Sequence, residues 1–201
     1  MIPGLLLAAG KSSRMGQPKA LLPVGPAGET FLQRIARNLC DGGVEEVVAV
    51  LGYRADLIRA TLPAGTIRAR LVDNEAYEQG QLSSLLTGLR TVDRPGVGAI
   101  LVTLVDVPLV SAETVRAVLA AYRGSGGAPI VRPVNRGRHG HPVIFDRALF
   151  SELRHADTAT GAKSVVNAHR AEVLEVEVPD EGAFVDIDTP EDYERYVGPK
   201  P

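Results

Sequence analysis

Glycines, serines and cations gather between Gly10 and Lys19, directly after a run of aliphatic residues. Gly10 and Gly16 have no side chains, so backbone N–H groups near them can approach an anion closely. Lys11, Arg14 and Lys19 supply the positive charge that phosphate oxygens require. This composition predicts a loop that holds the phosphates of a nucleoside triphosphate.

Two better-known phosphate-binding loops do not fit this stretch. The P-loop pattern is G-x-x-x-x-G-K-S/T; Gly10-Lys11-Ser12 fits its end, but Leu5 stands where its first glycine belongs. The dinucleotide-binding pattern G-x-G-x-x-G fails because Ser12 occupies its third position. The remaining alternative is a turn with a solvated basic surface. We favour the phosphate loop because loops this basic, directly after a buried strand, seldom lack a role.

Asp106 is the acid whose position points most directly to a metal ion. It follows the apolar run from Gly98 to Val105, and Pro108 stiffens the chain after it. A carboxylate at the carboxyl end of a central strand, beside a phosphate-binding loop, is well placed to hold Mg²⁺ against phosphate oxygens. The alternative is an aspartate that caps a turn before Pro108; the basic loop favours the metal.

A second acidic pair, Asp186 and Asp188, precedes Thr189-Pro190. Two-residue spacing on an extended segment directs both carboxylates to the same face. Mg²⁺ usually takes one or two protein carboxylates and keeps phosphates and waters for its other positions, so Asp106 with one of this pair would suffice. The alternative is that Asp188 belongs to the turn that starts the following helix.

Two further polar segments are candidates for substrate contacts. The segment from Gly80 to Ser84 offers an amide and two hydroxyls that suit a base edge or a ribose, and helix capping explains the serines equally well. The basic loop from Asn135 to His141 contains Arg136 and Arg138, which suit a phosphorylated substrate. Its histidines lack zinc-site spacing, and His141 suits a contact with substrate.

Composition excludes several classes of function. Lysine and arginine nearly balance aspartate and glutamate, 22 against 24, so no overall field favours nucleic acid or a membrane surface. The single cysteine, Cys40, leaves no internal disulfide and is expected to be a packed thiol in a reducing compartment. No segment is apolar enough to span a bilayer, and we expect no signal peptide because Met1 runs almost directly into the first expected strand. We therefore expect a cytoplasmic protein.

The elements that must position these residues follow from apolar patterning. Strand and helix alternate four times in the first half, which predicts a parallel sheet with helices on both faces. The expected strands cover residues 5–9, 44–51, 67–72 and 98–105. The expected helices cover residues 29–39, 55–62 and 82–89, with a fourth running from an N-cap at Ser111 to Tyr122.

The second half has a different pattern. Strands are expected over residues 129–134 and 142–145, an edge strand over 172–178, and short helices over 147–153 and 161–168. Thr189 with Pro190 predicts another helix start. A chain of 201 residues can bury its core as one domain. We expect one domain over 1–201, with a nucleotide-binding half (1–123) and an acceptor-binding half (124–201) that completes the metal site.

Five segments together resemble the molybdenum-cofactor nucleotidyltransferases, which belong to the nucleoside-triphosphate transferase superfamily. The first reads Leu-Ala-Ala-Gly-Lys-Ser-Ser-Arg-Met-Gly-Gln-Pro-Lys over residues 7–19, and the others are 80–85, 105–108, 140–143 and 186–193. They occur in the family's order and span nearly the whole chain. The resemblance implies a single-domain, Rossmann-like, three-layer α/β/α fold of the nucleotide-diphospho-sugar transferase type. Its sheet would be mostly parallel, with a smaller β-rich insertion on the acceptor side.

Within that family the details resemble the cytidylyl-transferring branch. Ala9 replaces a glycine typical of the guanylyl-transferring branch, Gln81 begins a segment that replaces its Gly-Pro-Leu-Ala-Gly type sequence, and Gly140-His141-Pro142 is of the cytidylyl type. The resemblance implies Mg²⁺-dependent transfer of CMP from CTP, or of another nucleotide from its NTP, to a phosphate monoester such as the molybdenum cofactor. Pyrophosphate would leave, and a molybdoenzyme-maturation partner is a further implication.

The resemblance also implies roles for individual residues. Arg14 would contact the leaving phosphates, Lys19 the α-phosphate, and Asp106 with Asp186 or Asp188 the metal. The implied nucleotide-binding residues are Leu7, Ala8, Ala9, Gly10, Lys11, Ser12, Ser13, Arg14, Gly16, Lys19, Gly80, Gln81, Ser83 and Ser84. The implied acceptor-binding residues are Arg136, Arg138, His139, Gly140 and His141.

Other functions remain as alternatives. One is a transferase that acts on a sugar or polyol phosphate, and another is a non-catalytic sensor that binds a nucleotide and signals through a partner. A redox function has less support because no dinucleotide-binding pattern is found.

Overall fold

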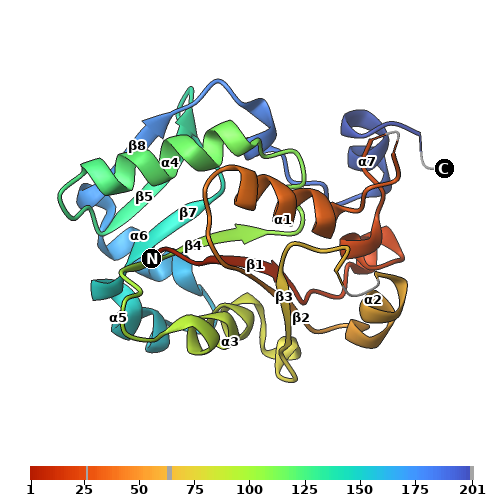
Figure 1. Cartoon of the computed structure of the whole chain (residues 1–201), viewed down its shortest axis with the longest axis horizontal. Coiled ribbons are helices and arrows are strands. Elements are labelled where there is room, and N and C mark those ends of the chain that lie inside the picture. Colours follow the sequence, from red (N-terminus) through yellow and green to blue (C-terminus); the bar gives the residue numbers. More distant parts are fainter. Residues whose placement is uncertain (26, 63–64, 200–201) are drawn as a thin grey trace.

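An eight-stranded sheet separates two layers of helices (Figure 1). The computed structural model describes residues 1–25, 27–62 and 65–199. The strand order is β3-β2-β1-β4-β7-β5-β6, and β8 pairs with β5. The strands are β1 (Gly4–Ala8), β2 (Val47–Leu51), β3 (Arg70–Asp73), β4 (Ala99–Leu104), β5 (Ile130–Asn135), β6 (Arg138–His139), β7 (Val143–Asp146) and β8 (Val173–Glu177).

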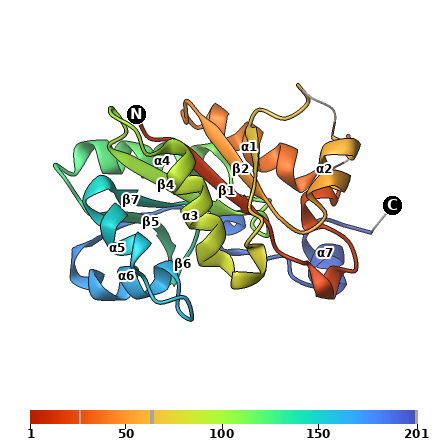
Figure 2. The ribbon, with the colours of Figure 1, turned by 90° about the horizontal axis from the view of Figure 1, so that it is seen from below.

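Helices cover both faces of this sheet. They are α1 (Phe31–Asp41), α2 (Ala55–Thr61), α3 (Gln81–Val92), α4 (Ala112–Gly124), α5 (Phe150–Arg154), α6 (Ala162–Ala168) and α7 (Pro190–Tyr196). The helices α1 and α4 pack on one face, while α3 and α5 pack on the other, which Figure 2 shows from below. No helix within the described ranges is long and apolar enough to cross a membrane.

The first strand shows why its sequence lacks polar alternation. Leu6 and Ala8 belong to the core under α1 and α4, whereas Leu5 and Leu7 belong to the core under α3. Successive side chains of a strand point to opposite faces, so a strand covered on both sides must be apolar throughout. The three-layer fold expected from the sequence is confirmed.

The first four strands, β1 to β4, are parallel, as predicted. The strand β1 pairs with β2 on one side and β4 on the other, and Leu7 lies opposite Leu104. The carboxyl ends of β1 and β4 therefore meet at one edge of the sheet. The chain leaves β1 toward α1 on one face and enters β4 from α3 on the other. Open α/β sheets bind ligands in the crevice between two neighbouring strands whose connections run to opposite faces of the sheet. In this chain that crevice lies between β1 and β4.

The second half adds antiparallel pairing. The strand β7 runs antiparallel to β4, and β5 runs antiparallel to β7. The strand β8 pairs with β5 alone among the described strands, so the predicted edge position is confirmed.

The basic loop that the sequence predicts over residues 135–141 contains a short strand, β6. Asn135 pairs with Arg138 across a two-residue turn whose φ angles are +49° at Arg136 and +76° at Gly137. Turns with two positive φ angles match the twist of a hairpin. An arginine at the first turn position concealed this hairpin in the sequence.

Several element boundaries differ from those predicted. The helix expected from Glu29 begins at Phe31 because Thr30 and Gln33 form a capping box. The strand expected over 67–72 covers Arg70–Asp73 instead, in register with β2. The predicted helix start at Thr189 is confirmed, since its side chain accepts a hydrogen bond from the Asp192 N–H.

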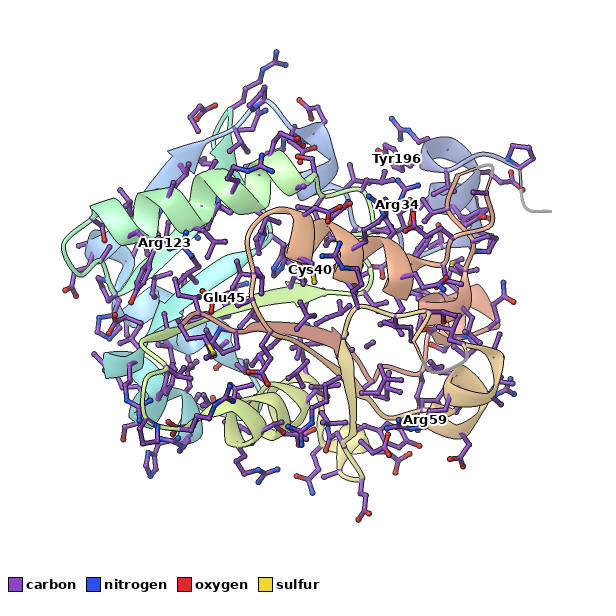
Figure 3. All side chains as sticks on the ribbon, in the orientation of Figure 1. Arg34, Cys40, Glu45, Arg59, Arg123 and Tyr196 are labelled. Carbon is purple, nitrogen blue, oxygen red and sulfur yellow. The ribbon has the colours of Figure 1, made fainter. Side chains whose placement is uncertain are left out.

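Cys40 lies near the end of α1, partly buried against the core (Figure 3). Its thiol is 3.5 Å from the carbonyl oxygen of Arg68. Burial raises the pKa of this thiol, which disfavours the nucleophilic thiolate. The packed thiol expected from the sequence is confirmed.

Candidate functional site

A cavity of about 280 Å³ opens where the carboxyl ends of β1 and β4 meet. The N–H of Val105 donates to the carbonyl oxygen of Leu7 at 3.0 Å, which joins the two strand ends. Most of the predicted nucleotide-binding residues line this cavity. The described lining residues are Leu7, Ala9, Gly10, Ser12, Ser13, Arg14, Lys19, Tyr77, Gly80, Gln81, Ser84, Leu104, Val105, Asp106 and Asp188.

The loop after β1 holds its shape through its own backbone. Ser12 has a φ of +51° and Gly16 a φ of +71°, so the chain turns sharply twice. The Ser12 hydroxyl accepts a hydrogen bond from the Lys19 N–H at 3.2 Å. Met15 is buried in a small apolar cluster that contains Phe31 and other residues. The loop is therefore anchored at both ends and in the middle.

Lys19 is the centre of the charged network. It is only 8% exposed, and its Nζ lies 2.5 Å from Asp188 Oδ1 and 3.7 Å from Asp106 Oδ2. The second oxygen of Asp188 lies 2.9 Å from Arg14 Nη2. The Lys19 ammonium, with the Arg14 guanidinium, holds the pKa of Asp188 below its usual range.

Asp188 reaches the loop because the C-terminal segment is tied to β4. The N–H of Ile187 donates to the carbonyl oxygen of Asp106 at 2.8 Å, and the Ile187 side chain is fully buried. On α7, the Tyr193 hydroxyl donates to the carbonyl oxygen of Pro23 at 2.8 Å. These contacts bring together residues that lie more than eighty positions apart in the chain.

One oxygen of the Asp106 carboxylate, Oδ1, lacks a partner in the described chain, whereas Oδ2 faces Lys19. The Oδ1 atom is buried, and the described part of the chain supplies no hydrogen bond to it. Burial raises the pKa of Asp106, Lys19 opposes this effect, and the negative charges of Asp186 and Asp188 add to it. An unpaired buried carboxylate oxygen is costly, and a cation in the cavity would remove that cost.

The charge of the cavity also fits a divalent cation. The lining cations, Arg14 and Lys19, are matched by the lining carboxylates, Asp106 and Asp188. A triphosphate would bring several negative charges without compensation. The described residues hold no cluster of three or more His, Cys, Asp or Glu ligands, but Mg²⁺ needs only one or two carboxylates when phosphates and waters complete its shell.

Some predicted nucleotide-binding residues lie elsewhere. The described cavity lining does not include Ala8, Lys11, Gly16 or Ser83. The amine of Lys11 is 2.6 Å from Glu78 Oε1. The hydroxyl of Ser83 is 2.8 Å from the carbonyl oxygen of Gly80, so it closes the turn before α3.

The sequence did not reveal the lining residue Tyr77 or Asn74, which supports the lining residue Ser84 from behind the cavity wall. Tyr77 lines the cavity. Asn74, just after β3, is 3% exposed and donates its amide to the hydroxyls of Ser83 at 2.8 Å and Ser84 at 3.1 Å. The sequence could have indicated Asn74, because Asn74 follows a strand whose carboxyl end lies at the same edge of the sheet as Asp106.

A second cavity, of about 400 Å³, adjoins the first. Leu7, Gln81 and Leu104 line both. The other described lining residues are Leu82, Leu85, Val102, Arg132, His139, Gly140, His141, Val143, Phe145, Ala162, Lys163 and Val166.

Three of the five predicted acceptor-binding residues, His139, Gly140 and His141, line this second cavity. Burial lowers the pKa of His141, which favours the neutral imidazole. Arg136 occupies the exposed β5–β6 turn. Arg138 pairs with Glu181 and lies over the Phe184 ring. The described lining of the second cavity does not include either arginine.

Gly140 is required where the second cavity meets the C-terminal segment. A Cβ there would overlap the carbonyl oxygen of Ala183 and the ring of Phe184, and the neighbouring N–H of His141 donates to that carbonyl at 3.0 Å. Gly140→Ala is expected to destabilise the fold by about 1–3 kcal/mol through overpacking. Thermal denaturation measures the effect.

Gly124→Ala is the matched control for this prediction. Gly124 ends α4 with open space around its Cβ position, so alanine there should leave the melting temperature unchanged or raise it. Equal melting temperatures for the wild type and Gly140→Ala would contradict the required close approach.

The chain is similar to proteins that have been named for different reactions. The family model of MobA-like NTP transferase domains matches residues 4–173. Nicotine blue oxidoreductase of Paenarthrobacter nicotinovorans is 32% identical, over 98% of this chain and 96% of that protein. A probable molybdenum cofactor guanylyltransferase of Mycobacterium avium (strain 104) is also 32% identical, over 81% and 77%. The molybdenum cofactor cytidylyltransferase of Escherichia coli K12 is 27% identical, over 96% of each chain.

Solved structures show the same fold. Rv0371c from Mycobacterium tuberculosis H37Rv superposes with a TM-score of 0.82 at 29% identity, covering 99% of each chain. Another structure of Rv0371c, in complex with manganese, has a TM-score of 0.78 at 28% identity, covering 98% and 97%. A divalent metal thus accompanies this fold in a relative. The resemblance read from the sequence is confirmed: the chain belongs to the family of MobA-like NTP transferase domains, and its enzyme class is that of the nucleotidyltransferases.

Proposed function

We propose that this chain transfers CMP from CTP to a phosphate monoester acceptor such as the molybdenum cofactor, with Mg²⁺ and release of pyrophosphate. The observation that carries the proposal is the convergence of Lys19 with Asp106 and Asp188 in the first cavity. This arrangement offers a buried cation and two carboxylates at the edge where parallel sheets bind nucleotides.

The proposed chemistry needs no protein base. A phosphate monoester is largely ionised near neutral pH because its second pKa is about 6, so it can attack the α-phosphorus directly. The bond to the α-phosphorus forms as the bond to the leaving pyrophosphate breaks. The protein then contributes positioning and charge neutralisation. Lys19 would stabilise negative charge at the α-phosphate, and Arg14 would contact the leaving phosphates.

Asp106 and Asp188 are the proposed metal-holding residues, with Asp186 as the alternative to Asp188. Mg²⁺, when bound, would neutralise phosphate charge beyond what two cations supply. Without it, the carboxylates would repel the triphosphate. Asp188 is favoured over Asp186 because it lines the cavity and contacts both cations.

The preference for CTP rests on Ala9 and Gln81, both in the cavity wall, and on the likeness to the Escherichia coli cytidylyltransferase. The likeness to the probable guanylyltransferase of Mycobacterium avium favours GTP instead. In keeping with the two adjoining cavities, we assign nucleotide binding to residues 1–123 and acceptor binding to residues 124–201. We place the reaction in the cytoplasm, with a molybdoenzyme-maturation partner as the recipient of the product.

The test is a panel of nucleotides. The purified protein with Mg²⁺ and molybdenum cofactor should release pyrophosphate from CTP at least ten times faster than from GTP, UTP or ATP. Faster release from GTP would replace the cytidylyl assignment by the guanylyl one. Thermal stabilisation by CTP with no release of pyrophosphate from any nucleotide would instead identify a nucleotide sensor. Transfer only to a sugar or polyol phosphate would show that this compound, and not the molybdenum cofactor, is the acceptor.

One comparison favours a second candidate, an oxidoreductase. Nicotine blue oxidoreductase is similar over nearly the whole of both chains, at a higher identity than the cytidylyltransferase. Incubation with NADH or NADPH and an electron-accepting dye tests this candidate. Dye reduction that depends on the protein, without pyrophosphate release, would favour it over nucleotidyl transfer.

A further inference from the structure

The second cavity has a wall of low polarity. Most of the side chains around it are aliphatic or aromatic, among them Leu82, Leu85, Val102, Val143, Phe145 and Val166. The described lining includes no Ser, Thr, Asp or Glu, and Gln81 is its single amide. A polyhydroxylated ligand would leave most of its hydroxyls without partners here, which costs binding energy.

Arg132 places a fixed cation in this wall. Its side chain is 14% exposed, and Nη2 lies 2.7 Å from Glu175 Oε1. The same oxygen lies 2.9 Å from His139 Nε2, so Glu175 holds both lining residues in place. The Nε of Arg132 is buried, and the described chain offers it no hydrogen-bond partner. A guanidinium with one side engaged and a donor unpaired is suited to an anionic ligand.

Lys163 adds a second cation from another element. It lies in the first turn of α6, lines the cavity and is exposed to solvent. No ion pair is found for it within the described ranges, in contrast to Lys11 and Lys19. The buried Nδ1 of His141 is a further polar atom of this cavity without a partner in the described chain.

We propose that the second cavity binds its ligand as a ring system with apolar faces that carries an anionic group, and that Arg132 and Lys163 bind the anionic group. This inference rests on the proposed function in one respect, that the ligand is the acceptor. It shifts the anion-binding role away from Arg136 and Arg138, which lie outside the described lining. It also disfavours a sugar or polyol phosphate as the acceptor, because that class lacks an apolar body.

Three probes separate the two features of the ligand. 1-Naphthyl phosphate has both the ring system and the anion, 1-naphthol lacks the anion, and sorbitol 6-phosphate lacks the ring. Calorimetric titration of the full chain, without nucleotide, should show binding of 1-naphthyl phosphate at least tenfold tighter than binding of either other probe. Equal or tighter binding of sorbitol 6-phosphate would overturn the apolar class of ligand.

Variants test the role of Lys163. Lys163→Ala should weaken binding of 1-naphthyl phosphate at least fivefold and leave 1-naphthol unchanged, and Lys163→Arg should restore binding. Arg170→Ala removes an exposed positive charge just beyond α6 and outside the described lining, so it is the matched control and should have no effect. An Arg136→Ala variant that weakens binding as much as Lys163→Ala would overturn the assignment.

Failure of this inference differs from failure of the proposed function. Pyrophosphate release with a polyol phosphate acceptor, and no binding of 1-naphthyl phosphate, would overturn the ligand class alone. Selective binding of 1-naphthyl phosphate, with no release of pyrophosphate from any nucleotide, would overturn nucleotidyl transfer and leave the binding site in place.

Discussion

Replacing Lys19 by alanine is expected to lower kcat for pyrophosphate release at least a hundredfold. The Lys19 ammonium is held in a buried position by Asp188, 2.5 Å away, so it is oriented before substrate arrives. A preorganised donor of this kind contributes about a hundredfold to a thousandfold in rate when it stabilises charge that develops during the reaction. Steady-state kinetics with CTP and Mg²⁺ measure the effect, and far-UV circular dichroism verifies the fold.

Lys11→Ala is the matched control for the Lys19 variant. It removes the same side chain from the same loop, but the Lys11 amine pairs with Glu78 outside the described cavity lining. We expect its kcat to change only a few-fold. A few-fold change for Lys19→Ala as well, with the fold intact, would refute the proposed role of Lys19 at the α-phosphate.

Asp106→Asn is expected to abolish the Mg²⁺-dependent reaction. The amide keeps the size of the side chain but loses the negative charge that a hard cation requires. Stability should not fall, because burial already disfavours the charged form of Asp106 and its Oδ1 has no partner in the described chain. The measurements are initial rates over a range of Mg²⁺ concentrations and the melting temperature without metal.

Asp186→Asn and Asp188→Asn complete the experiment. The larger loss is expected for Asp188→Asn, because Asp188 lines the cavity and also orients Lys19 and Arg14. Full activity of Asp106→Asn at the wild-type Mg²⁺ requirement would place the metal elsewhere. A loss of activity in Asp186→Asn but not in Asp188→Asn would identify Asp186, and not Asp188, as the second metal ligand.

Local rules explain what could be predicted well. The apolar run before Gly10 predicted a doubly covered strand, and β1 is buried on both faces. The hydroxyl of Thr189 with Pro190 predicted the start of α7, and the capping box is present. In both cases the structure depends on residues only a few positions apart, which a sequence displays directly.

Pairing between distant residues explains what could not be predicted. Lys11 carries the same charge as Lys19 and lies in the same loop, yet Lys11 pairs with Glu78, which is 67 positions away in the chain. Arg136 and Arg138 were the obvious cations of the basic loop, but the tight turn and Glu181 hold them outside the described lining of the second cavity. Arg132 and Lys163 come from a strand and a helix that nothing in the sequence pattern brings together.

The sequence alone determined the class of fold and the glycine-containing basic loop after the first strand, and it predicted that this loop binds phosphates and acts with Asp106 and the acids at 186 and 188. These depend on periodicity, on glycine and proline, and on the order of motifs along the chain. Only the tertiary structure decided which cations face a cavity and which are neutralised on the surface. The physical reason is that ion pairs and burial depend on the register of strands and the packing of helices, which bring together side chains from segments far apart in the chain.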